Sequence, residues 1–155
     1  MPSPDSLAVR VDRLVAPGIV DMHFDLLMDL WEKRRRANVL VDDHLATLRA
    51  GHMGVIAAAI YLLDGYLPEM ALRVALGQIA RLYTEVGTTD AFAICRRYSD
   101  IEAARQAGRI ALLITMEGVE PLGSDLNLLR IFYELGVRQV GLTHARRNYA
   151  GDGGV

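Results

Sequence analysis

Only one cysteine, Cys95, occurs in the 155 residues of this sequence. A single thiol cannot form an internal disulfide, which excludes the framework of a small disulfide-rich secreted domain and suits a reducing cytosol. The surrounding AFAICRR is typical of a strand, so we expect Cys95 to be a packing residue and not a reactive thiol.

Basic charge is not in excess either, since the formal net charge is −2. We therefore expect no nucleic-acid partner.

Long apolar runs are also missing. The longest, VIAAAIYLL at 55–63, has the length of a strand and falls short of the roughly 18 apolar residues of a membrane-spanning helix. Residues 1–17 contain charges at Asp5, Arg10, Asp12 and Arg13, which interrupt any apolar core of a signal peptide. We therefore treat residues 1–17 as an N-terminal extension, and expect a cytoplasmic protein that does not bind membranes.

Strand and helix patterns alternate along the rest of the chain, which is 52% hydrophobic and 23% charged and hence typical of a globular protein. We expect strands at 18–27, 53–63, 91–97, 109–118 and 137–144. Helices are expected at 42–51, 68–87, 99–108 and 124–136, and a polar connection at 31–43. Strands that are apolar on both faces and alternate with helices indicate parallel βα units in an α/β fold.

Ligand-type side chains stand at the ends of three of these strands. His23 and Asp25 are two residues apart in GIVDMHFDLL and would point the same way from a strand, and Glu117 and His144 close two later strands. In a parallel barrel the carboxyl ends of all strands meet at one face, so these groups would converge. Their chemistry suits a divalent metal such as zinc, with Glu117 able to bridge two ions and His144 able to stabilise an oxyanion.

Each of these residues has a simpler interpretation when taken alone. The aspartate of a His-x-Asp pair can merely orient a core histidine, a terminal glutamate can be a surface residue, and a histidine before a loop can be structural. Their joint position at matching strand ends favours the metal site. His44 and His52 are expected to be surface or packing residues, and the basic cluster EKRRR at 32–36 a solvated loop or a contact for phosphate.

Two blocks carry a family resemblance. VDMHFDLL resembles the Asp-x-His-x-Asp-Leu start of the membrane dipeptidase (renal dipeptidase) family of zinc peptidases. Residues 116–153, which include MEGVEPLG, LLRIFYELGVR and GLTHARRN, resemble the central block of that family. The resemblance implies a (β/α)8 TIM barrel, of which residues 18–155 supply the N-terminal portion with about the first five βα units.

The same resemblance implies an activity and a set of site residues. It implies a zinc-dependent dipeptidase that cleaves dipeptides with a metal-activated water and holds two zinc ions. His23 and Asp25 match ligands of one ion, and Glu117 matches the carboxylate that bridges both. His144 matches the histidine that contacts the substrate and steadies the tetrahedral intermediate, and Asn148 falls near the substrate pocket. The resemblance leaves open whether the protein forms a homo-oligomer.

The chain also departs from the family pattern. A complete barrel takes about 250 residues, so the family's two further zinc histidines and its substrate-binding arginine are not expected here. Either the sequence is a fragment or a second chain supplies the remainder, and we expect the 155-residue chain alone to be inactive. Two alternatives stay open: another binuclear-metal amidohydrolase-like barrel enzyme, and a non-catalytic barrel domain that binds a partner.

Overall fold

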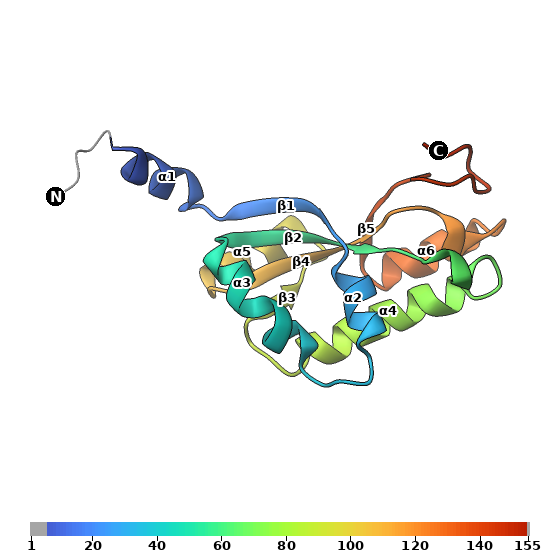
Figure 1. Cartoon of the computed structure of the whole chain (residues 1–155), viewed down its shortest axis with the longest axis horizontal. Helices are drawn as coiled ribbons and strands as arrows, with labels where there is room; N and C mark the ends of the chain where they lie inside the picture. The colour runs from blue at the N-terminus through green and yellow to red at the C-terminus, as the bar shows by residue number, and fades with distance from the viewer. Residues whose placement is uncertain (1–5, 155) are drawn as a thin grey trace.

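A parallel five-stranded sheet with helices packed against it forms the body of the molecule (Figure 1). The computed structural model describes residues 6–154. The strands are β1 (Ile19–Phe24), β2 (Met53–Ile60), β3 (Phe92–Ile94), β4 (Ile110–Met116) and β5 (Val137–Val140). The α-helices are α1 (Leu7–Val15), α2 (Leu26–Glu32), α3 (Ala46–Ala50), α4 (Ala71–Val86), α5 (Tyr98–Gln106) and α6 (Asn127–Glu134). A π-helical turn η1 (Leu40–Leu45) and two 3-10 turns, η2 (Asp64–Tyr66) and η3 (Glu120–Leu122), complete the elements.

Strand β4 is the centre of the sheet. One edge of β4 pairs with β2, which in turn pairs with β1, and every pairing in the sheet is parallel. The other edge is shared: β3 pairs with the first half of β4 and β5 with the second half. The strand order is therefore β1-β2-β4-β3, with β5 as an additional strand that pairs with β4.

The register of β2 and β4 places their carboxyl ends level with each other. Ile60 pairs with Met116, and the amide of Glu117 donates a hydrogen bond to the carbonyl of Ile60 at 3.2 Å. The last five residues of β2 are buried, as expected for a strand covered on both faces. The first residues beyond β4 therefore emerge from a rigid and fully packed part of the sheet.

Helix α2 was not predicted from the sequence. The strand predicted at 18–27 ends at Phe24, and α2 begins at Leu26 inside the predicted strand and polar connection. Leu26, Leu27 and Leu30 form one helical face and are completely buried, each contributing about 1.5–3 kcal/mol. Because apolar residues stand on both sides of Asp25, hydrophobicity alone did not reveal the boundary.

Other boundaries also differ from the prediction. Helix α1 lies within the predicted extension, and the Ser6 hydroxyl caps it by accepting a hydrogen bond from the Val9 amide at 3.4 Å. None of its residues is buried, and Figure 1 shows it extending away from the sheet. The helix predicted at 42–51 is preceded by η1, which starts at Leu40. Strand β5 ends at Val140, so the predicted last four residues belong to a loop.

Candidate metal centre

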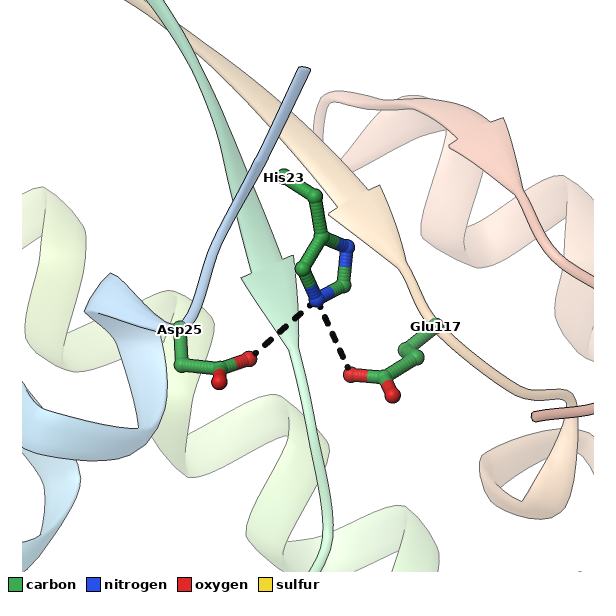
Figure 2. Close-up of side chains that lie close together, drawn as sticks. All are labelled: His23, Asp25 and Glu117. Carbon is green, nitrogen blue, oxygen red and sulfur yellow. Dashed lines mark ion pairs between the residues drawn. The ribbon is translucent and has the colours of Figure 1, made fainter. Parts of the chain in front are cut away.

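Three ligand-type side chains meet beyond the carboxyl ends of β1 and β4 (Figure 2). His23 is the last residue but one of β1, Asp25 directly follows that strand, and Glu117 directly follows β4. The sequence predicted that these residues would converge, and the structure places them together. Their roles as metal ligands stay predictions.

The spacing of the donor atoms fits a divalent ion. His23 Nε2 lies 3.4 Å from Asp25 Oδ1 and 3.4 Å from Glu117 Oε2, and donor atoms of all three residues lie within 4.8 Å of one another. Bonds of about 2.1 Å to a tetrahedral zinc ion separate neighbouring ligand atoms by about 3.4 Å. One imidazole and two carboxylates are also ligands that zinc accepts. This donor set therefore fits a metal ion.

Asp25 reaches the cluster from a helix terminus and not from a strand. It is the N-cap residue of α2, with φ −72° and ψ 37°, yet its side chain makes no capping hydrogen bond. Aspartate at this position usually accepts a hydrogen bond from the first turn of the helix. Because Asp25 leaves that role unused, its carboxylate is available to the site.

The two oxygens of Glu117 have different partners. Oε2 faces His23, and Oε1 contacts Nδ1 of His144. The Glu117 side chain is 8% exposed, whereas those of His23 and His144 are more than half exposed. Burial raises the pKa of the Glu117 carboxyl above its ordinary value, and the neighbouring histidines act in the opposite direction. Each oxygen of the Glu117 carboxylate thus faces a different histidine.

Gly141 brings the segment that carries His144 alongside Glu117. Its amide donates a hydrogen bond to the Met116 carbonyl at 2.8 Å, and a Cβ atom at this position would lie 2.5 Å from the Glu117 carbonyl oxygen. Only glycine permits this close approach of two backbones. We call residues 141–148 the His144 segment.

Asn148 belongs to the His144 segment but not to the cluster. Its Nδ2 donates to the Leu142 carbonyl at 2.8 Å, and its Oδ1 accepts from the Ala150 amide at 2.8 Å. It lines a separate cavity of about 140 Å³ with Leu67, Pro68, Glu120, Arg147 and Tyr149. Both polar atoms of the side chain thus bond within the loop. The predicted place of Asn148 near the substrate stays a prediction.

Arg146 and Tyr61 were not singled out from the sequence. Arg146 follows His144 by two residues and extends to the end of β2, where its guanidinium contacts Tyr61. Together with Glu117 and His144 they line a cavity of about 10 Å³, roughly the space of one water molecule. Nothing in the sequence distinguishes Arg146 from the adjacent Arg147, so only the folded structure identifies it.

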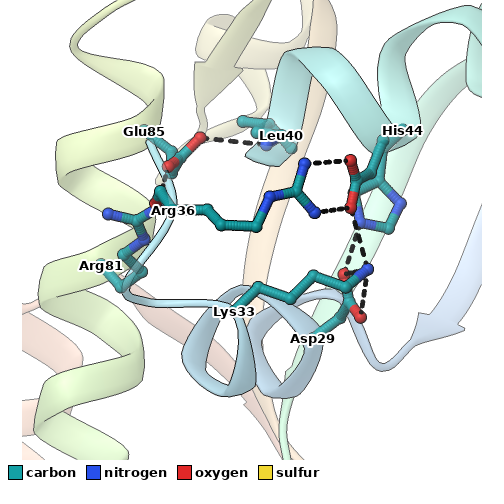
Figure 3. Close-up of polar contacts among 8 residues, drawn as sticks. Asp29, Lys33, Arg36, Leu40, His44, Arg81 and Glu85 are labelled. Carbon is teal, nitrogen blue, oxygen red and sulfur yellow. Dashed lines mark hydrogen bonds and ion pairs between the residues drawn. The ribbon is translucent and has the colours of Figure 1, made fainter. Parts of the chain in front are cut away.

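A second polar cluster fixes α2 to η1 (Figure 3). Lys33 lies 2.9 Å from Asp29 and 3.0 Å from Asp43, and Arg36 makes two hydrogen bonds of 2.9 Å to Asp43. Arg36 and Lys33 lower the pKa of Asp43 from 3.8 to about 2. Part of the basic cluster at 32–36 is thus engaged in intramolecular ion pairs. His44 Nε2 joins the cluster at 2.8 Å from Asp29.

The remaining thiol and histidines agree with their predicted packing or surface roles. Cys95 is fully buried, and burial raises the pKa of its thiol. The ring of His44 packs edge-on against Phe24 with 5.9 Å between centroids, and His52 is exposed. Among residues 6–154, no helix combines the length and the apolar character needed to cross a bilayer.

A parallel α/β sheet whose strand ends gather a histidine and two carboxylates is an arrangement typical of metal-dependent hydrolases built on barrels. The sequence profile described as "Membrane dipeptidase (Peptidase family M19)" matches residues 10–154. The chain belongs to this family, which confirms the resemblance and the fold class predicted from the sequence.

Individual relatives agree with this assignment. Dipeptidase 3 of Homo sapiens is 31% identical over 141 residues, covering 81% of this chain and 27% of the relative. Dipeptidase verJ of Clonostachys rogersoniana is 32% identical over 83 residues, covering 53% of this chain and 21% of the relative. A solved metallopeptidase from Rhodobacter sphaeroides, liganded with a phosphinate mimic of the dipeptide L-Ala-D-Ala, superposes with a TM-score of 0.76 at 22% identity, covering 84% of this chain and 46% of that one.

The chain thus spans less than half the length of these relatives. What they share with it is the fold and the family of metallopeptidases, which implies a metal cofactor. The metal ligands, the substrate and the catalytic steps of this particular protein are the subject of proposals.

Proposed function

We propose that this chain is the N-terminal part of a zinc-dependent dipeptidase that hydrolyses the peptide bond of dipeptides. The observation that carries the proposal is the meeting of His23, Asp25 and Glu117 within 4.8 Å at the strand ends. The family match over residues 10–154 supports the interpretation of this cluster as a metal site. The same three side chains would be weak evidence in an unrelated fold.

Each side chain would have a separate task. His23 and Asp25 would hold one zinc ion, and the Glu117 carboxylate would serve that ion and a second. When bound, zinc would lower the pKa of its water molecule and so provide a nucleophile at neutral pH. The Nδ1 contact to Glu117 orients the ring of His144 and leaves Nε2 for the substrate, where it would stabilise the oxyanion of the attacked carbonyl.

The rest of the site would come from the βα units that this chain does not contain. His44 is engaged with Asp29, and His52 is an exposed residue before β2, so neither is placed to ligate the second ion. We therefore propose that the 155-residue chain alone is inactive. We use "complete protein" for the polypeptide or assembly in which the remaining units close the barrel. Its cytoplasmic location stays a prediction.

The test is the metal content and the peptidase activity of the complete protein. We expect bound zinc, detected by inductively coupled plasma mass spectrometry, and hydrolysis of L-Ala-D-Ala, detected by chromatography of the released alanine. Glu117→Gln should lower both zinc affinity and hydrolysis by at least about a hundredfold, because the shared carboxylate is lost. Glu102→Gln, in helix α5, is the matched control and should retain both.

The other outcomes separate the alternatives. A complete protein without bound metal would contradict the proposal and favour a non-catalytic domain that binds a partner. A protein that binds metal but hydrolyses a different amide would favour another binuclear-metal amidohydrolase-like enzyme.

A further inference from the structure

Arg146 connects the His144 segment to the carboxyl end of β2. Its two terminal nitrogens donate to the Leu62 carbonyl at 3.1 and 3.0 Å, and one of them also donates to the Tyr61 hydroxyl at 3.0 Å. The same nitrogen lies 3.1 Å from Asp64 Oδ1, and the guanidinium lies 5.6 Å from the centroid of the Tyr61 ring. The planar fork of an arginine suits such a set of acceptors, which a single ammonium group cannot contact in the same way.

The His144 segment has few other attachments to the sheet. Strand β5 ends at Val140, and beyond it the Gly141 amide donates to Met116 and the Val119 amide donates to Leu142 at 3.4 Å. The amide of Asn148 and the Nδ2 group of its side chain donate within the loop itself. Arg146 therefore supplies a side-chain link that holds the part of the segment beyond Leu142 against a strand end.

The adjacent Arg147 shows the contrast. Its side chain is 84% exposed and pairs only with Asp152, at 3.3 Å, which is also exposed. Arg146 is 24% exposed and has its donors directed at the backbone and side chains that follow β2. Two neighbouring arginines of equal charge thus differ in whether they fix the segment.

We propose that Arg146 is a positioning residue that holds His144 against Glu117, an inference that rests on the proposed role of His144 in peptide hydrolysis. Its hydrogen bonds to Leu62 and Tyr61 connect the segment to the end of β2, and β2 pairs in register with β4, which Glu117 directly follows. The histidine and the carboxylate are therefore placed by the same pair of strands. Both terminal nitrogens of Arg146 are thus directed at groups that follow β2.

The experiment compares Arg146→Ala, Arg146→Lys and the matched control Arg147→Ala in the complete protein. Hydrogen exchange reports the segment directly, because the Gly154 amide donates to the His144 carbonyl at 2.7 Å. Arg146→Ala should speed exchange of this amide by roughly tenfold to a hundredfold, the effect of losing hydrogen bonds from a charged donor. It should lower kcat by about tenfold or more, leave KM within about twofold, and leave zinc content unchanged, as expected when positioning is lost.

The lysine variant separates positioning from charge. If Arg146 acts only through its positive charge, Arg146→Lys will restore both exchange and kcat, and the proposal is wrong. If the fork is needed, Arg146→Lys will resemble Arg146→Ala. Unchanged exchange in Arg146→Ala, or an equal effect of Arg147→Ala, would also overturn the proposal.

Tyr61→Phe keeps the proposal testable if Arg146→Ala does not fold. It removes one acceptor of the guanidinium and should speed Gly154 exchange in the same direction by a smaller factor, and an unchanged rate would count against the proposal. The exchange readout needs no catalysis. A complete protein that lacks peptidase activity would therefore refute the proposed function, while the exchange rates still decide whether Arg146 fixes the segment.

Discussion

The close approach of Gly141 to Glu117 can be tested by adding a single methyl group. In Gly141→Ala the new Cβ atom would lie 2.5 Å from the Glu117 carbonyl oxygen, whereas ordinary contact begins at 3.4 Å. The obstacle is backbone at the end of β4, which is held by pairing to β2 and cannot turn away as a side chain could. The His144 segment must therefore move outward by about 1 Å, the difference between these two distances.

Two effects of known size follow from that displacement. Overpacking of this kind costs about 1–3 kcal/mol of folding free energy, part of it from stretching the hydrogen bond between the Gly141 amide and Met116. A misplacement of about 1 Å in a catalytic group lowers the rate by about a hundredfold. We thus expect Gly141→Ala to lose about two orders of magnitude in kcat while most of the protein stays folded.

The assay is denaturant unfolding together with hydrolysis of L-Ala-D-Ala by the complete protein. Gly151→Ala is the matched control, because a Cβ atom there would meet nothing within 4 Å. If Gly141→Ala retained wild-type stability and kcat, the two backbones would not be in the close contact described. If Gly151→Ala were equally impaired, the loss would reflect general loop flexibility and not contact with Glu117.

Two further predictions concern the neighbouring groups. His144→Ala should lower kcat by about two to three orders of magnitude, since one oxyanion donor is lost, with zinc content unchanged; simultaneous loss of zinc would instead make His144 a ligand. Because Arg36 and Lys33 hold the pKa of Asp43 at about 2, below its ordinary 3.8, the unfolded chain protonates first as pH falls, so this contribution to stability is complete above about pH 4 and disappears towards about pH 2. Asp43→Asn should flatten the decline in unfolding midpoint over that range, whereas the control Asp42→Asn should not, and an equal slope in both would refute the ion-pair explanation.

Strands β2 and β4 were predicted because their apolar composition indicates burial. VIAAAI in β2 and IALLITM in β4 are apolar on both faces, which only a strand inside a parallel sheet requires. The position of Glu117 followed directly from the boundary of β4, whereas His23 lies in β1, whose predicted end was three residues too late. The meeting of their side chains could therefore be predicted without knowledge of any individual contact.

The features that were missed depend on contacts distant in sequence. Asp25 was expected on a strand, but the chain turns into α2 at that point because Leu26, Leu27 and Leu30 are buried by packing. The placement of β3 beside β4 likewise depends on which edge of β4 is free, and no periodicity encodes it. Arg146 could not be distinguished from Arg147, since its acceptors on Tyr61 and Leu62 are 84 or more residues away.

The central position of β4 also has a consequence for the order in which the chain acquires structure during synthesis. Strands β2, β3 and β5 all pair with β4, so the second edge of β2 has no strand to pair with until β4 has left the ribosome. At about 5–20 residues per second, the roughly 50 residues between these strands take about 3–10 s to synthesise. For that time the unpaired backbone groups along this edge of β2 can pair with other nascent chains, so β2 is exposed to association during translation.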